Sequence, residues 1–195
     1  MLQSSSGKPV RGTVIRTIAD GEPDTGFTEA YEVVDPRGKL IGLVDLDIAT
    51  RKQKGRGYRK EFDFVPEWTE PTPEKSPNMV LINKINTNGD VKCKGIGTAL
   101  CLIAMEVARA KGEGRLYIEH ANYNSHSALS VLGFQPVHHD QNRVAKAKNA
   151  ISQAHHSMLQ GGTPNTSQLM SISMYLPRET LREKLAQATP ILTQS

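Results

Sequence analysis

The stretch Lys92-Cys93-Lys94-Gly95-Ile96-Gly97-Thr98-Ala99-Leu100 joins a predicted strand to a predicted helix. Before it, residues 79–85 form an apolar run rich in branched side chains, as in a buried strand. After it, apolar residues recur at helical spacing from Leu100 onward, and Gly112 and Gly114 supply the stop. The sequence therefore predicts a strand, a glycine turn and a helix, and the rest of the chain supports this turn.

The turn is suited to binding an anion. Gly95 and Gly97 let the backbone approach a ligand closely, and the first amides of a helix that starts near Thr98 have no intrahelical acceptors. The positive end of the helix dipole favours negative charge at the same place. Lys92 and Lys94 add two cations beside it.

Three kinds of phosphate-binding turn compete at this position. A P-loop is excluded because no Gly-Lys-Ser/Thr ends the stretch. A dinucleotide fingerprint needs a third glycine near Leu100, and that glycine is absent. The remaining pattern, Lys92-x-x-Gly95-x-Gly97, resembles the Q/R-x-x-G-x-G/A turn of the GCN5-related N-acetyltransferases. A plain glycine-containing strand-to-helix turn is the structural alternative.

A second signature follows at the expected distance. Residues 115–120 are typical of a strand, and the segment after them reads Asn122-Tyr123-Asn124-Ser125 and ends in Leu132-Gly133-Phe134. This resembles the family's second motif: an asparagine, a small residue three positions on, a helix, and Leu-Gly-Phe before another strand. Two motifs in order are more specific than either alone. The resemblance covers residues 78–138.

The resemblance implies a fold and a coenzyme. The fold is mixed α/β (α+β): a mixed, mostly antiparallel sheet of six to seven strands flanked by helices. The acyl donor is acetyl-coenzyme A, whose pyrophosphate is held in the family by the amides of the glycine turn. The residues implied for this role are Lys92, Cys93, Lys94, Gly95, Ile96, Gly97 and Thr98. Main-chain groups of Ile85, Asn86 and Thr87 are expected to pair with the pantetheine arm, and Asn122 and Ser125 to bind it from the other side.

The implied reaction is acetyl transfer to a primary amine of a protein, peptide or small molecule. The family's usual acid, a tyrosine four residues before the glycine of Leu-Gly-Phe, is replaced here by Leu129. The usual strand carboxylate is also missing. The candidates for proton transfer are His120, Glu119 and Tyr123, with Asp45 and Asp47 on an earlier strand. Histidine is the side chain best suited to proton transfer near neutral pH, although a single histidine is more often structural.

The 195 residues predict one domain with one core. Residues 1–12 are expected to be loose, and strands are expected over 13–18, 30–35 and 39–49. Residues 19–29 hold at most a short helical turn, where the family usually has two helices. The helix expected over 141–160 is an insertion that lines the acceptor cleft, covers the sheet or makes a homodimer contact. A final helix is expected over 178–188.

The long connection 50–77 is basic in its first part and proline-rich in its second. Six cations lie between Arg51 and Lys60, and Tyr58 is their one aromatic neighbour. A solvated loop is therefore favoured over a nucleic-acid platform, and nucleic acid is not the expected partner. A nucleic-acid-associated protein that uses residues 51–60 remains an alternative, as does a coenzyme-binding regulatory or interaction module without turnover.

Composition and local sequence argue against a membrane-spanning, secreted or metal-binding protein. The net charge is +4 with histidines neutral, and no apolar run approaches the roughly 18 residues of a membrane span. The start of the chain has no apolar segment typical of a signal peptide, and two cysteines do not make a disulfide framework, so we expect a cytoplasmic protein. The adjacent pairs His138-His139 and His155-His156 cannot chelate from a strand or helix, so no metal is expected.

Overall fold

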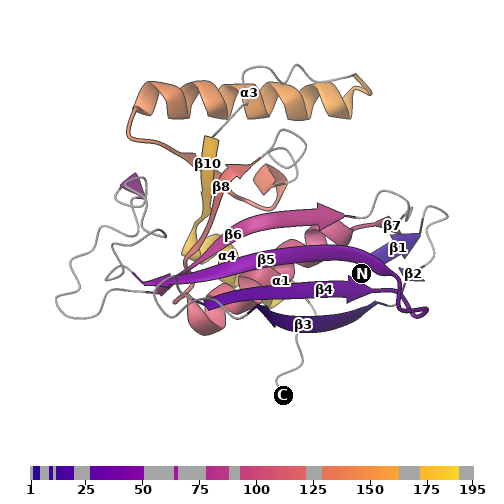
Figure 1. Cartoon of the computed structure of the whole chain (residues 1–195). Helices are drawn as coiled ribbons and strands as arrows, with labels where there is room; N and C mark the ends of the chain where they lie inside the picture. The colour runs from indigo at the N-terminus through magenta and orange to yellow at the C-terminus, as the bar shows by residue number, and fades with distance from the viewer. Residues whose placement is uncertain are drawn as a thin grey trace.

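The computed structural model describes residues 2–4, 9–10, 12–19, 27–50, 64–65, 78–87, 93–121, 129–162 and 172–188 (Figure 1). Within these residues, the main elements are β3 (Thr13–Ala19), β4 (Phe27–Val34), β5 (Leu40–Thr50), β6 (Asn78–Thr87), α1 (Ile96–Lys111), β8 (Leu116–Ala121), β9 (Gln135–Val137), α3 (Gln141–Leu159), β10 (Ile172–Leu176) and α4 (Arg178–Gln187). Three short strands stand apart: β1 (Leu2–Ser4), β2 (Pro9–Val10) and β7 (Cys93–Lys94).

The main sheet has seven strands in the order β3-β4-β5-β6-β8-β10-β9. Every neighbouring pair is antiparallel except β6 and β8, which are parallel and joined through the crossover helix α1. A parallel pair requires such a crossover. The expected mixed, mostly antiparallel sheet of six to seven strands flanked by helices is therefore confirmed.

The sheet has an apolar core on each face, because successive strand residues point to opposite sides. On β6, Val80 and Ile82 join the larger core with α1, whereas Met79 and Leu81 join a smaller core on the other face. Helix α1 supplies the larger core with side chains at helical spacing: Ile96, Leu100, Ile103, Ala104 and Val107. Helix α4 contacts α1, and α3 contacts β9 and buries Ala147, Ala150, Ile151 and Ala154 in the larger core.

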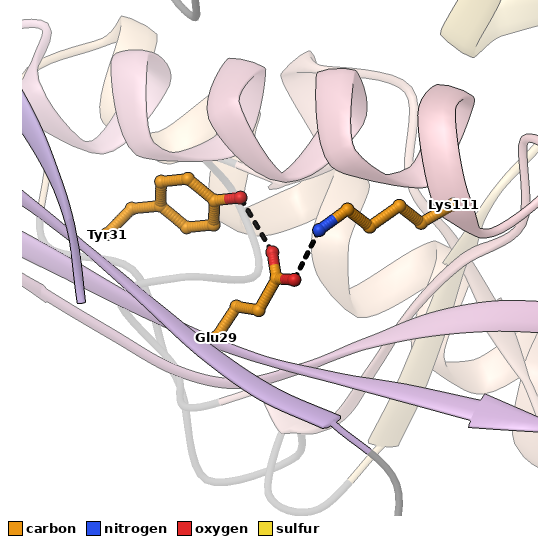
Figure 2. Close-up of polar contacts among 3 residues, drawn as sticks. All are labelled: Glu29, Tyr31 and Lys111. Atoms are coloured by element: carbon orange, nitrogen blue, oxygen red, sulfur yellow. Dashed lines mark hydrogen bonds and ion pairs between the residues drawn. The ribbon is translucent and has the colours of Figure 1, made fainter. Parts of the chain in front are cut away.

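An ion pair ties the C-terminal end of α1 to strand β4. Glu29 is 3% exposed, accepts a hydrogen bond of 2.7 Å from the Tyr31 hydroxyl, and pairs through its other oxygen with the Lys111 ammonium (Figure 2). A buried carboxylate needs such partners. The contact anchors β4 beneath α1.

The N-terminal segment differs from the expectation of a loose end. Residues Leu2–Ser4 and Pro9–Val10 are the strands β1 and β2, and β1 pairs antiparallel with both β2 and β7. Such short strands carry no periodic signal in the sequence, so their pairing with distant β7 could not be anticipated.

The long connection 50–77 is described only at its start and at Phe64 and Val65, so the basic run lies outside the described residues. Val65 is fully buried in the smaller core, which anchors the connection to the sheet. The helices expected over 141–160 and 178–188 are α3 and α4. Within the described ranges, no helix is both long enough and apolar enough to cross a membrane.

Candidate functional site

Strands β6 and β8 separate partway along their length. Their parallel pairing runs only from Val80 and Leu116 to Ile82 and Ile118. Beyond that level, β6 stays paired with β5, while β8 stays paired with β10 as far as Ala121. The facing edges of residues 83–87 and 119–121, which we call the β6–β8 opening, are not paired with each other as strands.

Both strands carry an irregularity where the opening begins. On β6, Asn83 is the extra residue, because Asp45 pairs with Lys84 and Leu46 pairs with Ile82. On β8, the register with β10 shifts between Ile118 and Ala121. Bulges bend a strand and redirect its groups, and they are common beside active sites. Since no described strand covers the edge of residues 83–87 that faces β8, an extended ligand could add there as a further strand.

The first turn of α1 presents amides that have no acceptor within the helix. Its N-cap is Gly95, which is exposed, has φ of 87° and makes no side-chain capping bond. The first intrahelical bond joins the Ala99 amide to the Gly95 carbonyl at 2.9 Å, so the amides of residues 96–98 have no acceptor within the helix. The first turn contains no acidic residue, which leaves the positive end of the helix dipole uncompensated within the helix.

Gly42 places this helix end beside the opening. Gly42 pairs with Thr87, the last residue of β6, and a Cβ atom at Gly42 would lie 2.6 Å from Ile96 Cγ2. The first turn of α1 is therefore seated at the same end of the sheet as residues 83–87. A Cβ atom at Gly97 would meet nothing within 4 Å, so there is open space on the outer side of the turn.

The described part of the predicted coenzyme site lies together at this end. Asn86, Thr87 and Thr98 are exposed, Ile85 and Gly97 are half-buried, and Ile96 is buried in the core, where only its backbone can serve a ligand. Cys93 and Lys94 form β7, and nothing is described of their side chains. Lys92, Asn122, Tyr123 and Ser125 lie outside the described residues. The assignment of these residues to a coenzyme stays a prediction.

The candidate groups for proton transfer differ in their position relative to the β6–β8 opening and in their burial. Glu119 is half-buried and follows Ile118, the last residue of the parallel pairing, so it lies where the opening begins. His120 is the next residue of β8, but its side chain is not described. Asp45 and Asp47 are half-buried on β5. Leu129, at the position of the family's tyrosine, is 1% exposed and belongs to the larger core.

The Cys101 thiol does not suit chemistry at this site. Burial raises the pKa of the Cys101 thiol to about 12, so this cysteine is not a nucleophile near neutral pH. In the parts of the chain that the structure describes, no three His, Cys, Asp or Glu side chains are grouped to hold a metal ion. The expectation that the protein uses no metal stays a prediction.

Sequence reasoning missed the roles of Gly42 and Asn83. A glycine inside a strand pattern is a signal of close backbone approach, and Gly42 had that signal. Asn83 had none, because a bulge is visible only once the partner strand and its register are known.

No protein-family model matches the sequence, and no curated protein matches it. Solved structures do match. A bacterial toxin has 13% identity and a TM-score of 0.54, over 92% of this chain and 99% of that one. AtaT complexed with acetyl-methionyl-tRNAfMet has 15% identity and a TM-score of 0.51, over 88% and 98%. A tyrosine-to-phenylalanine variant of KacT has 15% identity and a TM-score of 0.50, over 80% and 75%.

At such identities the matches establish the fold alone, and they agree with the topology. The parallel β6–β8 pair, the crossover helix between its strands and the antiparallel strands on either side have the arrangement expected from the two sequence motifs. The chain therefore has the fold of the GCN5-related N-acetyltransferases.

Proposed function

We propose that this protein is an acetyl-coenzyme A-dependent N-acetyltransferase that acts on a primary amine. One observation supports the proposal above the others: the β6–β8 opening and the first-turn amides of α1, which have no acceptor within the helix, lie at the same end of the sheet. An anion site beside an unpaired strand edge suits a molecule with a diphosphate at one end of an amide-containing arm.

The proposed chemistry gives each group a role. The amides of residues 96–98 bind the pyrophosphate, and the free edge of residues 85–87 binds the pantetheine arm. The backbone at the Asn83 bulge stabilises the oxyanion as the amine attacks the thioester carbonyl. Glu119 or His120 accepts the proton of the ammonium. The C–S bond then breaks, and the thiolate of coenzyme A takes a proton from Tyr123 or from water, because Leu129 cannot supply one.

The sharpest test of the coenzyme site is Gly97→Val. A Cβ atom at this position would meet no protein atom within 4 Å, so we expect the fold to accept the added side chain and a bound ligand to be displaced by it. The matched control is Thr98→Val, which places the same side chain on the next, exposed position and keeps the amide. We expect Gly97→Val to abolish acetyl-coenzyme A binding in calorimetry without lowering the melting temperature, and the control to bind normally. Unchanged affinity in Gly97→Val would refute the site.

A turnover assay distinguishes an enzyme from a coenzyme-binding module without activity. The expected result is release of free thiol from acetyl-coenzyme A when amines, peptides or proteins are added. The regulatory alternative is supported by the buried Leu129 at the tyrosine position. Under that alternative, acetyl-coenzyme A raises the melting temperature while no amine causes thiol release. We propose the cytoplasm as the compartment for either activity.

A second candidate function is acetylation of an amine carried by a nucleic acid. Helix α3 exposes Arg143, Lys146 and Lys148 and contains no acidic residue, which suits contact with phosphates. AtaT, which shares the fold, is solved with acetyl-methionyl-tRNAfMet. The test is gel retardation by RNA at two salt concentrations. The paired variant Lys146→Glu/Lys148→Glu should abolish retardation, while Gln153→Glu, on the same exposed helix, should weaken it less.

A further inference from the structure

The N-terminal strands lie against the segment that enters the proposed coenzyme turn. Strand β1 pairs antiparallel with β7, with Gln3 opposite Lys94 and Ser4 opposite Cys93. Lys94 is followed directly by Gly95, the N-cap of α1. Strand β2 pairs with the other edge of β1, so the small sheet has the order β2-β1-β7, beside the end of β6 in Figure 1.

Strand β7 depends on this small sheet for its position. Among the described strands, β7 pairs only with β1, and the main sheet contains no residue of β7. On the other side of the turn, Ile96 is fixed by its contact with Gly42. The turn at Gly95 is therefore held from one side by the main sheet, through α1, and from the other side by residues at the start of the chain.

We propose that the N-terminal strand pair β1 and β2 (residues 2–4 and 9–10), which we call the N-terminal hairpin, is a positioning element of the coenzyme site. This inference rests on the proposed function. By pairing with β7, the hairpin holds the backbone that leads into Gly95 in one conformation before the ligand arrives. Without it, this backbone must be ordered at the moment of binding, and the lost conformational freedom lowers the affinity.

The hairpin is separate from the main sheet, which begins with β3 and contains neither β1 nor β2. Its loss is therefore expected to weaken coenzyme binding without unfolding the protein. A tenfold loss of affinity corresponds to about 1.4 kcal/mol, a modest part of a typical binding free energy.

The test is the double variant Gln3→Pro/Ser4→Pro in the full chain. Proline removes two backbone donors from β1 and disrupts its pairing with β7. The matched control is Gln3→Ala/Ser4→Ala, which changes the same side chains and keeps the backbone donors. We expect the dissociation constant for acetyl-coenzyme A to rise about tenfold in the proline variant and to change less than twofold in the alanine variant.

Kinetics distinguish positioning from general damage. The KM for acetyl-coenzyme A should rise about tenfold in the proline variant, while kcat at saturating coenzyme stays within twofold, because the hairpin lies at the turn and not at the thioester. Deletion of residues 1–10 is the second variant and should reproduce both values.

The outcomes separate the two proposals. If the wild-type protein binds acetyl-coenzyme A and the proline variant binds equally well, the hairpin has no positioning role, and the proposed function stands. If the alanine control loses as much affinity as the proline variant, side chains and not strand pairing are responsible, and the inference is wrong. It is equally wrong if both the proline variant and the deletion lose their cooperative thermal transition. A wild-type protein that does not bind acetyl-coenzyme A would remove the proposed function itself.

Discussion

Ile96 of α1 lies directly against Gly42 of β5, and a Cβ atom at Gly42 would stand 2.6 Å from Ile96 Cγ2. A second atom, Leu100 Cδ1, would be 3.1 Å away. The absence of a side chain at this one strand position therefore allows the first turn of α1 to approach the sheet. Because Gly42 pairs with Thr87, the approach also sets how close the first-turn amides lie to the β6–β8 opening.

We predict that Gly42→Ala displaces the start of α1. The added methyl group overpacks a filled core, which costs about 1–3 kcal/mol, and it weakens acetyl-coenzyme A binding by shifting the amides. The compensating variant is Gly42→Ala/Ile96→Ala, in which the opposing methyl group is removed. A double-mutant cycle on urea unfolding should show the pair to be more stable than the sum of its single changes. Additive effects would contradict the contact.

The fold could be predicted around the glycine turn because its signals are local. The apolar run 79–85 lies within β6, the helical spacing after Leu100 lies within α1, and the Leu-Gly-Phe segment directly precedes β9. The N-terminal hairpin could not be predicted, because β1 and β2 are held by pairing with residues that are distant in sequence. Val65 was also missed, since the pair Phe64-Val65 is too short to show a periodicity.

The candidate site could also be predicted only in part. The glycines and the first-turn amides follow from a short motif, whereas the opening between β6 and β8 depends on where a parallel pairing stops. The sequence predicted a helix start near Thr98, whereas α1 begins at Ile96. The two differ because Gly95, the N-cap, has no side chain that would mark the helix start in the sequence.

Lys111→Met is expected to destabilise the fold. Of the two contacts of the buried Glu29 carboxylate in Figure 2, only the one with the Tyr31 hydroxyl is kept. Loss of a charged partner from a buried group costs about 1–3 kcal/mol of stability. Lys111→Arg keeps the charge and should cost less. Glu29→Gln/Lys111→Met, which removes both charges, should recover part of the loss. Urea unfolding measures all three, and equal stability of the Met and Arg variants would argue against the ion pair.

Leu129→Tyr tests whether the family's tyrosine can simply be restored. Leu129 is 1% exposed in the larger core, so a tyrosine there adds volume and buries a hydroxyl. We expect a loss of about 1–3 kcal/mol in stability and no gain in turnover. Leu129→Met, which conserves volume, is the control and should change stability less. A rise in turnover with unchanged stability would show that this position does face the reacting groups.

Glu119→Gln and His120→Gln distinguish the two candidate bases. Removal of a general base typically lowers the rate by about 10²–10⁴-fold, while binding of a coenzyme held by backbone groups is unaffected. One of the two variants should therefore lose kcat and keep the wild-type KM for acetyl-coenzyme A. Glu183→Gln, at an exposed carboxylate of α4, is the control. Wild-type rates in both variants would remove β8 as the source of the base.

The Cys101 thiol should react only when the protein unfolds. Burial raises its pKa from 9.0 to about 12, so at pH 8 the folded protein contains almost no thiolate at this position. In a Cys93→Ser background, a disulfide reagent should label Cys101 slowly in buffer and rapidly in urea.

The raised pKa of Cys101 also makes stability depend on pH, because above about pH 9 the unfolded chain releases a proton that the folded chain retains. Stability should therefore be unaffected by this group below pH 9 and fall as the pH rises toward 12, by about 1.4 kcal/mol per unit. Cys101→Ala should lack this part of the slope, and an identical pH dependence in both proteins would show that the thiol is not buried as described.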